Sequence, residues 1–422
     1  MRVVRSSQLE ESFFISFPQD DQAAVRDVLE SVLREGDRAL VRHSAEFDGV
    51  ALDGVRVGSE EIERAAAALA GPLASALDLA SDNLRAFAER QLEQLRDFEA
   101  EIRPGVRCGQ RVVPIERIGV YVPAGRHPLF SSLLMAAVPA RVAGVSEIAV
   151  CSPPVAAGSV HPLILAAAGR LGLGEVYRVG GIQAIGALAF GTESVRRVDK
   201  IVGPGNRYVA MAKKAVFGAV GVDLIAGPSE ILIVADETAD PGLVAADLLA
   251  QAEHDADAEA VLITDSERLA ALVLGEVHSR LPALPTCAVA EASLRRKGFI
   301  VLVDDLDEAV ALSNRKAPEH LELHVKEADV WARRFLHYGS VFVGPGAAEA
   351  LADYTAGINH TLPTAGSARF ASGLSVRDFL KVQTTLRVDD KGLAEIGRAA
   401  RLMAEAEGLA GHAASLAARI GR

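Results

Sequence analysis

The sequence predicts an α/β fold with two sheet-bearing domains and helical extensions at both ends. From about Gly105 onward, short runs rich in β-branched residues alternate with alanine-rich stretches of helical periodicity. Strands separated by one helix each form βαβ units, in which the strands are parallel and helices cover both faces of the sheet. Because 422 residues exceed the size of one ordinary core, two sheets in separate domains are the expected arrangement.

Each element has its own signal. Residues 20–100 are expected to be helical, with Ser59 as an N-cap ahead of a glutamate-rich first turn and apolar spacings of three and four from Leu73 to Phe98. Strands of a first series are expected at 118–123, 147–153, 175–180, 200–205 and 230–236, and those of a second series at 260–264, 298–305, 320–325 and 340–346. From Ser375 the pattern becomes helical and polar and ends in an amphipathic helix.

The composition disfavours several classes of protein. A net charge of −12 disfavours nucleic acid or an anionic membrane as the main partner, because both require clustered Lys and Arg. The best apolar stretch, 129–150, is interrupted by Pro139, Arg141 and Glu147 and falls short of the roughly 18–20 uncharged residues of a membrane span. The N-terminus lacks the apolar core of a signal peptide. Three separated cysteines predict free thiols in a reducing cytoplasm.

One glycine-rich turn suggests a nucleotide site. Gly203-Pro204-Gly205-Asn206 follows an expected strand and precedes an expected helix, whose free N–H groups and dipole attract phosphate. The same residues also suit an ordinary βα turn, and the chain lacks a GxGxxG motif. Gly-Pro-Gly recurs after the strand at 340–346, which fits two similar sheet domains.

A possible metal site begins on one helix. Asp240-Pro241 predicts the start of a helix that carries Gln251 and His254 one turn apart on one face. An imidazole beside an amide oxygen is a workable half of a zinc site that needs two further ligands. A solvated helix face would show the same spacing.

A second polar cluster lies on an expected strand. Alternation places His320, Glu322 and His324 on one side of this strand, directly after Pro318 and Glu319. A Glu-His pair beside a proline bend suits a base and a water activator. A polar strand edge is the alternative.

Other polar residues have weaker signals. The loop-like segment with Asp353, Asn359 and His360 suits either a binding site or simple turn chemistry. Glu407 and His412 in the tail are typical of an exposed helix. The cysteines Cys108, Cys151 and Cys287 are expected to be structural thiols, since Cys108 and Cys151 have no sequence-adjacent base.

Together these segments resemble the histidinol dehydrogenase family. The matching runs keep the family's order from about residue 104 to 412: PGVRCGQRVVPIERIGVYVPAGRHPLFSSLLM, GGIQAIGALAFGTESVRRVDKIVGPGNRYV, AGPSEILIVAD, LLAQAEH, APEHLEL, DYTAGINHTLPT, ASGLSVRDFLKV and EGLAGH. The resemblance implies oxidation of L-histidinol to L-histidine through L-histidinal, with one zinc ion per subunit and two NAD⁺ in succession.

The resemblance also implies the site residues. The implied catalytic pair is Glu319 and His320. The implied zinc ligands are Gln251, His254, Asp353 and His412. The implied substrate contacts are Ser229, Gln251, His254, His320, Asp353, His360, Glu407 and His412. The implied NAD contacts are Tyr121, Gln183 and Asn206.

The resemblance further implies a cytoplasmic homodimer of two Rossmann-like domains with swapped extensions, in which the C-terminal tail completes the partner subunit's active site. The implied boundaries are 1–20 for an N-terminal arm, 21–119 with 227–374 for a first, discontinuous domain that carries the metal and catalytic residues, 120–226 for the NAD-binding domain and 375–422 for a C-terminal helical extension.

Two other functions remain open at this point. A relative could act on another small amino- or sulfo-alcohol with the same zinc and NAD. His360, Glu407 and His412 favour a substrate with imidazole and amine, whereas His127, at a variable position, keeps this alternative open. A non-catalytic, zinc-stabilised dimer would lack the Glu319-His320 pair, which is present.

Overall fold

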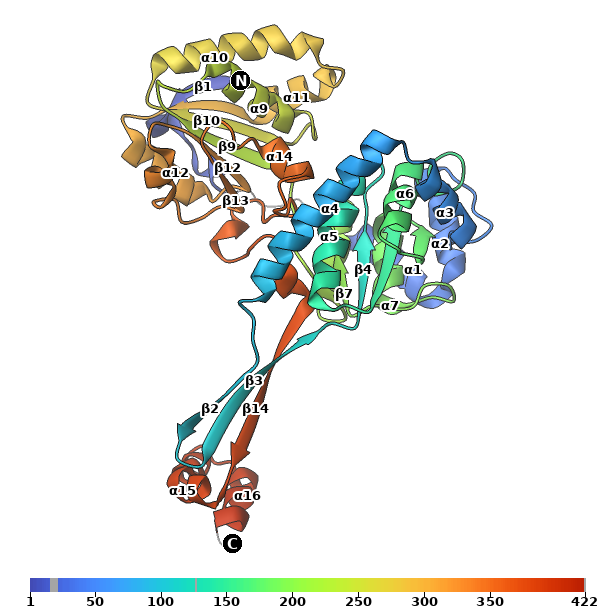
Figure 1. Ribbon diagram of the computed structural model, residues 1–422, viewed down its shortest axis with the longest axis vertical. Helices are drawn as coiled ribbons and strands as arrows, with labels where there is room; N and C mark the ends of the chain where they lie inside the picture. The colour runs from blue at the N-terminus through green and yellow to red at the C-terminus, as the bar shows by residue number, and fades with distance from the viewer. Residues whose placement is uncertain (16–21, 126, 421–422) are drawn as a thin grey trace.

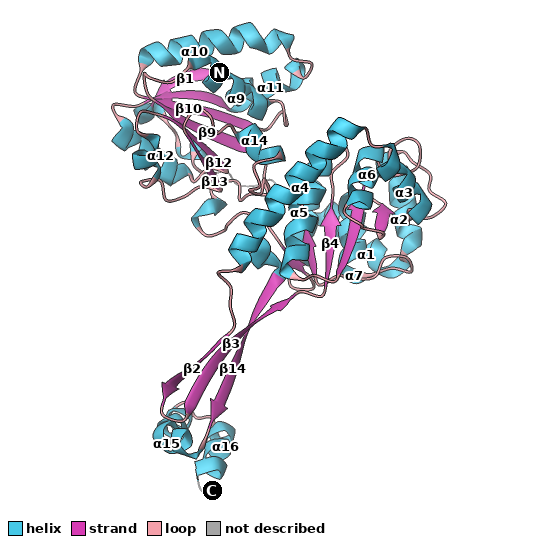
Figure 2. Ribbon diagram, in the orientation of Figure 1, coloured by secondary structure: helices cyan, strands magenta, loops and turns pink. Residues whose placement is uncertain are grey.

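Two parallel sheets form the two bodies of the computed structural model, which describes residues 1–15, 22–125 and 127–420. A third, antiparallel sheet forms a long arm that projects from the bodies and ends in two helices (Figures 1 and 2). This mixed arrangement confirms the predicted α/β class with parallel sheets. In the described ranges, no helix is both long and apolar enough to span a membrane.

The first body is built on a six-stranded parallel sheet. Its order is β1 (Arg2–Arg5), β11 (Gly298–Leu302), β10 (Glu259–Thr264), β9 (Glu230–Ala235), β12 (His320–His324) and β13 (Ser340–Val343). One face packs against α9 (Pro241–Ala252), α10 (Glu267–Arg280) and α11 (Cys287–Lys297). The other face packs against α12 (Leu306–Lys316) and α13 (Ala328–Ala332). The chain moves outward from β9 to β11 and then returns to β12, so the strand order reverses between β9 and β12.

The second body has a five-stranded parallel sheet. Its order is β6 (Val176–Arg178), β5 (Glu147–Ser152), β4 (Arg117–Tyr121), β7 (Lys200–Val202) and β8 (Gly221–Val222). One face packs against α3 (Ser59–Ala68), α4 (Gly71–Leu92), α5 (Phe130–Ala143) and α6 (Pro162–Arg170). The other face packs against α1 (Gln22–Glu35), α2 (Asp37–His43), α7 (Gly181–Phe190) and α8 (Arg207–Val216).

The strands and helix starts follow the sequence signals closely. All nine expected strands are present, with ends within a few residues of those predicted. Asp240 caps α9 by accepting a hydrogen bond from the N–H of Gly242, and Pro241 occupies the first turn, as predicted. Ser59 opens α3, with Gly58 rather than Ser59 at the N-cap.

The N-terminal helices differ from the expected domain division, which grouped residues 21–119 with 227–374. Helices α1–α4 instead bury their apolar stripes against the five-stranded sheet. Periodicity shows that a helix has a buried face but does not show which sheet covers that face. In the expected N-terminal arm, β1 pairs with β11 and extends the six-stranded sheet. Residues 16–20 of that arm lie outside the described residues.

The long antiparallel arm differs from the sequence prediction in two respects. Residues 98–114 form β2 (Phe98–Arg103) and β3 (Val106–Pro114), and the expected all-helical tail contains a strand, β14 (Leu380–Val388), that pairs antiparallel with β3. Only then do α15 (Asp390–Ala406) and α16 (Ala410–Ile420) follow. Apolar residues alternate with polar ones along β14, a strand signal that a helical interpretation of the tail overlooks.

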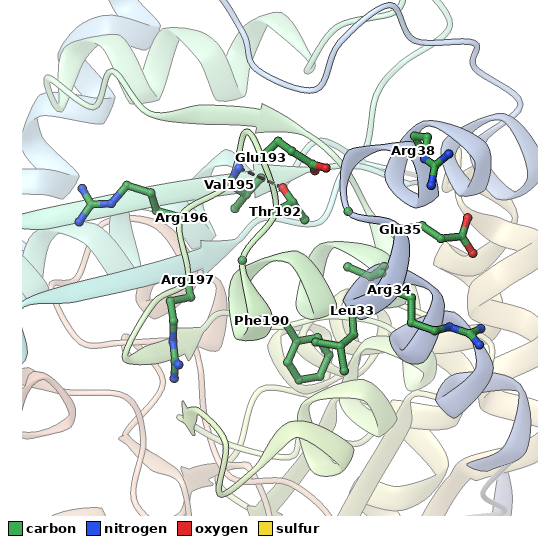
Figure 3. A pocket seen from close by; sticks show the side chains of 13 residues that line it. Leu33, Arg34, Glu35, Arg38, Phe190, Thr192, Glu193, Val195, Arg196 and Arg197 are labelled. Carbon is green, nitrogen blue, oxygen red and sulfur yellow. Dashed lines mark hydrogen bonds between the residues drawn. The ribbon is translucent and has the colours of Figure 1, made fainter.

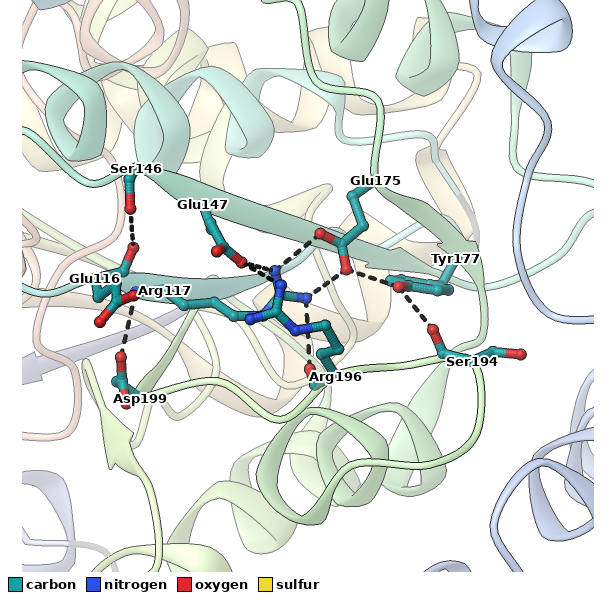
Figure 4. A network of polar contacts seen from close by, with 9 residues as sticks. All are labelled: Glu116, Arg117, Ser146, Glu147, Glu175, Tyr177, Ser194, Arg196 and Asp199. Atoms are coloured by element: carbon teal, nitrogen blue, oxygen red, sulfur yellow. Dashed lines mark hydrogen bonds and ion pairs between the residues drawn. The ribbon is translucent and has the colours of Figure 1, made fainter.

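A charged network joins the starts of three strands in the second body (Figure 4). The buried guanidinium of Arg117 on β4 donates hydrogen bonds to Glu147 at 2.6 Å and to Glu175 at 2.9 Å. The hydroxyl of Tyr177 lies 2.7 Å from Glu175. Burial alone would raise the pKa of Glu175, but the hydrogen bonds from Arg117 and Tyr177 lower it below the ordinary 4.5. The network therefore stabilises the register of β4, β5 and β6.

Replacing Arg117 with Met should lower the free energy of unfolding by about 3 kcal/mol, because two carboxylates lose the buried cation that pairs them. Because Glu175 has a lowered pKa when folded, its contribution is present above pH 4.5 and is lost as the pH falls below that value. Urea unfolding at several pH values measures both effects. Arg196→Met removes an exposed partner of Glu147 and should change the stability by less than about 0.5 kcal/mol; an equal loss in both variants would contradict the assignment.

Candidate metal and active site

The predicted catalytic pair and three of the four predicted zinc ligands, all except His412, gather at one edge of the six-stranded sheet. Glu319 and His320 lie at the start of β12, next to the start of β9. Helix α9 runs back from the ends of the strands, so Gln251 in its last turn returns to this edge. His254, predicted on the same helix, lies two residues beyond its end. Parallel sheets usually bind ligands at the carboxyl ends of their strands. Here the polar residues lie at the opposite edge.

Three potential metal ligands converge there. One ligand atom each from His254, Glu349 and Asp353 lie within 4.8 Å of one another. Gln251 is fully buried, and neither its amide oxygen nor its amide nitrogen has a hydrogen-bond partner. The Oε2 atom of Glu349 is also buried and unpartnered. Buried polar atoms of this kind normally find partners, so these residues fit a bound cation.

The Glu319-His320 pair is buried against β9. A carboxylate oxygen of Glu319 accepts a hydrogen bond from the N–H of Glu230 at 2.9 Å, and the Nδ1 atom of His320 lies 3.1 Å from the carbonyl oxygen of Glu230. Burial lowers the pKa of His320 to about 4, against the opposing effect of Asp353. Burial raises the pKa of Glu319 well above its ordinary value. The imidazole of His320 is therefore neutral at neutral pH and able to accept a proton.

The backbone before this pair is tightly constrained. Ala317 ends α12 in a left-handed conformation with φ 53°, directly before Pro318, which disfavours continuation of the helix. The carbonyl of Glu319 then accepts a hydrogen bond from the N–H of Ser340 at 2.9 Å, which joins the turn to β13. Buried Lys316 forms an ion pair with Glu259 at 2.7 Å. These contacts fix where β12 begins.

The loop after α14 (Glu349–Tyr354) joins the site to the second body. His360, a predicted substrate contact, has its Nδ1 atom 3.0 Å from the carbonyl oxygen of Asp353 and its Nε2 atom 3.2 Å from the hydroxyl of Ser132 on α5. The side-chain amide of Asn359 donates to the carbonyl of Met135 at 2.7 Å. Since α5 follows β4, these contacts place the loop after α14 next to the carboxyl edge of the five-stranded sheet.

The predicted nucleotide residues lie at that carboxyl edge. Tyr121 ends β4, where the strand order reverses, and its hydroxyl accepts a hydrogen bond from the N–H of Gly181 at 3.1 Å. Gln183 is buried, and its amide atoms have no hydrogen-bond partner. Asn206 caps α8 through hydrogen bonds from two backbone N–H groups. A side chain at Gly203 would place a Cβ atom 2.2 Å from the carbonyl oxygen of Tyr121, so only glycine fits this turn.

Glu407 and His412 lie away from the polar edge of the six-stranded sheet, whereas Ser229 lies beside it and His127 lies in a loop of the second body. Glu407 and His412 are exposed and belong to the helical end of the arm, which projects away from the six-stranded sheet (Figure 1). Ser229 directly precedes β9, and its carbonyl accepts a hydrogen bond from Glu259. His127 is exposed in the loop after β4, as expected for a loop histidine.

Sequence reasoning missed three residues that contact the site: Glu230, Glu349 and Ser132. Glu349 opens a short helix, where an acidic residue is common for reasons of helix dipole alone. Ser132 and Glu230 lie in runs that resemble the family, but nothing in their spacing connects them to His360 or Glu319. Only the folded chain brings them together.

A second cluster on the same sheet face differs from the first. Ligand atoms of Asp247, Glu322 and His324 lie within 4.8 Å of one another. Burial next to Glu322 raises the pKa of Asp247 to about 7, so the two carboxyl groups share a proton. His324 lies 3.4 Å from Glu322 and completes this internal network. The alternation of His320, Glu322 and His324 on one face is thus as predicted.

A hollow of about 860 Å³ lies on the second body, between the end of α1 and the loop after α7. Its arginines Arg34, Arg38 and Arg196 point in different directions (Figure 3). A carboxylate oxygen of Glu193 accepts a hydrogen bond from the N–H of Asp37 at 2.8 Å. The hollow contains none of the predicted site residues.

Comparisons with known proteins identify the family of the chain. A family model described as histidinol dehydrogenase matches residues 16–420. The chain belongs to the histidinol dehydrogenase family. The histidinol dehydrogenase of Ruegeria pomeroyi is 47% identical over 405 residues, which cover 96% of this chain and 93% of that protein. That of Rhizobium meliloti is 47% identical over 404 residues, with 95% and 92% covered.

A solved structure extends the family likeness to the fold. The crystal structure of histidinol dehydrogenase from Elizabethkingia anophelis matches with a TM-score of 0.94 at 39% identity, and the match covers 100% of this chain and 97% of that one. The histidinol dehydrogenase fold therefore extends over both bodies and the arm.

The two polar clusters should differ in metal binding. Loss of a residue that only supports a metal ligand weakens metal binding by ~10–100-fold. Asp353→Asn should weaken binding of a divalent metal by more than this, because it would remove a predicted direct ligand. Asp247→Asn alters the internally satisfied cluster and should leave metal content unchanged. Metal analysis of both variants after dialysis measures this. Metal loss from Asp247→Asn alone would assign the metal to the other cluster.

Proposed function

We propose that the protein oxidises L-histidinol to L-histidine through L-histidinal, using zinc and two NAD⁺ in succession. The observation that carries this proposal is the convergence of His254, Glu349 and Asp353 beside the buried Glu319-His320 pair, with the buried amide of Gln251 left without a hydrogen-bond partner. The family relationship supports the substrate, because the relatives that match over nearly the whole chain are named histidinol dehydrogenase.

The donor set fits zinc better than magnesium or calcium. The proposed donors are a nitrogen of His254, an oxygen of Asp353 and the amide of Gln251. They leave a further ligand position on the zinc ion, which we assign to His412. Zinc, when bound, supplies an electrostatic anchor for the imidazole and amino nitrogens of the substrate, without a redox role. The hydride acceptor is NAD⁺, which we place against Tyr121 and Gln183 at the carboxyl edge of the five-stranded sheet.

The roles of the catalytic pair follow from their protonation. Neutral His320 accepts the hydroxyl proton as hydride leaves the alcohol carbon, which gives the aldehyde. Glu319 then activates a water molecule that adds to the aldehyde, and His320 again accepts a proton as the hydrate loses its hydride. One water and two NAD⁺ are consumed per L-histidinol, so the four-electron oxidation balances. Ser229, His360 and Glu407 hold the substrate in this proposal.

We also propose a homodimer with exchanged tails. In a single chain, His412 and Glu407 lie at the far end of the arm, away from the other predicted ligands (Figure 1). The arm exposes apolar side chains at Phe98, Ile102, Val382, Leu386, Leu402 and Met403. Exposed apolar surface of this kind marks a protein interface. A two-fold dimer would cover it and bring each tail to the partner's metal cluster.

Three free cysteines suit a cytoplasmic enzyme, and Cys151 is fully buried, which raises the pKa of its thiol. A buried thiol with a raised pKa is a poor nucleophile, so the aldehyde step is assigned to Glu319 and His320. The alternative, a family relative that oxidises another amino- or sulfo-alcohol, is tested with the same protein in the assay below.

With L-histidinol and NAD⁺, the zinc-loaded protein should form two NADH per substrate molecule. Chelation should abolish the absorbance at 340 nm, and zinc should restore it. His320→Asn should lower kcat by about 10²–10⁴ while zinc stays bound, because only the proton acceptor is lost.

The control is the zinc-loaded protein with other amino- and sulfo-alcohols. Turnover of one of these, without turnover of L-histidinol, would replace the substrate assignment. Unchanged turnover in His320→Asn would remove His320 from the mechanism.

Tail exchange should permit complementation between two inactive variants. His412→Ala damages the tail and His320→Asn damages the catalytic body, yet a mixed dimer would contain one site with both parts intact. Co-expression should restore about a quarter of the wild-type activity, since half the dimers are mixed and each has one of two sites intact. Activity no higher than the sum of the two variants would show that each tail serves its own chain.

A further inference from the structure

We propose that Glu349 is a positioning residue for His320: its buried carboxylate holds the imidazole ring with Nδ1 protonated, so that Nε2 faces the substrate. This inference rests on the function proposed above, and it assigns a role to a residue that sequence patterns and the family motifs quoted above leave unassigned. Glu349 is 4% exposed, and its Oε1 atom lies 3.4 Å from the Nδ1 atom of His320.

The surroundings of Nδ1 determine the tautomer of His320. The carbonyl oxygen of Glu230, 3.1 Å away, can only accept a hydrogen bond, so Nδ1 must carry a proton. A carboxylate oxygen of Glu319 lies farther off, at 3.7 Å, and accepts the N–H of Glu230. Glu349 is thus the nearest carboxylate to Nδ1 and lies within ion-pair distance of it. The ring is left with Nε2 as the only nitrogen that can take a proton from a substrate.

The charge of Glu349 matters at the moment of proton transfer. When Nε2 takes the hydroxyl proton, the O–H bond breaks, an N–H bond forms, and the ring becomes a cation in a buried site. A cation buried away from water is costly unless an opposite charge lies close by. The backbone carbonyl of Glu230 orients the ring but carries no net charge. Glu349 supplies this charge when it is ionised, in the way that a buried carboxylate supports the histidine of a catalytic triad.

The fold holds Glu349 firmly in this place. Its N–H donates to a carboxylate oxygen of Glu322 at 2.8 Å, which ties the start of α14 to β12, the strand that carries His320. Its Oε2 atom is unpartnered and buried, and a ligand atom of its carboxylate lies within 4.8 Å of His254 and Asp353. Glu349 therefore lies between the proposed zinc ligands and the proposed base.

A double-mutant cycle tests whether Glu349 acts through His320. Glu349→Gln keeps the size of the side chain and removes its charge, and should lower kcat by about 10–100-fold with KM and zinc content unchanged. In the His320→Asn background the same substitution should cost nothing further, because the ring it positions is absent. Glu322→Gln is the matched control: it removes a neighbouring buried carboxylate but keeps an acceptor for the N–H of Glu349, and should retain the wild-type rate.

Two results would overturn the proposal. An equal loss in both backgrounds would make the role of Glu349 independent of His320, and a loss of zinc from Glu349→Gln would make Glu349 a metal ligand instead.

An activity-free measurement separates this inference from the proposed function. The Nδ1 proton of His320, assigned by its absence in His320→Asn, should give a protected NMR signal in the zinc-loaded wild type and in Glu322→Gln. It should be lost to solvent exchange in Glu349→Gln. Persistence of that signal overturns the positioning role even if the substrate proves to be another alcohol. A wild type that is inactive with L-histidinol but shows the expected signals would overturn the substrate assignment alone.

Discussion

The burial of several carboxylates side by side is the constraint on which the rest of the site depends. Glu319 and Glu349 lie within one cluster near Asp353, and burial raises the pKa of both above the ordinary value. Like charges brought out of water repel each other unless protons, hydrogen bonds or a cation compensate them. Backbone N–H groups compensate part of this charge, as the N–H of Glu230 does for Glu319. The divalent cation proposed above would complete the compensation, and it would link metal binding to the protonation of the catalytic pair.

This constraint also explains the placement of the surrounding elements. Buried Lys316 ends α12 and forms an ion pair with Glu259, so these two buried charges neutralise each other next to the start of β12. The left-handed Ala317 and Pro318 then turn the chain sharply into β12. With both neighbouring strands hydrogen-bonded to β12, the side chains of Glu319 and His320 have little freedom to move. A rigid scaffold of this kind holds reacting groups in a productive geometry.

The sequence alone predicted local features and short-range chemistry well. Nine of the eleven strands of the two parallel sheets, the cap of α9 at Asp240 and the shared face of His320 and Glu322 follow from periodicity and capping rules, whereas the short strands β1 and β8 were not predicted. Those rules act over a few residues. They could not show that α1–α4 pack on the five-stranded sheet, since an apolar stripe is compatible with either sheet. They also could not single out Glu349, whose contact with His320 joins residues 29 positions apart through tertiary packing.

The two sheets contribute opposite edges to one site. The five-stranded sheet presents its carboxyl edge, where Tyr121 marks the reversal of strand order that suits a nucleotide. The six-stranded sheet presents the starts of its strands, because α9 and β12 bring their polar residues to that edge. Hydride transfer requires donor and acceptor carbons within about 3–3.5 Å, so the two edges must face each other. The hydrogen bonds from Ser132 to His360 and from Asn359 to Met135 join helix α5 of one body to the loop after α14 of the other, so they help to set the relative position of the two edges.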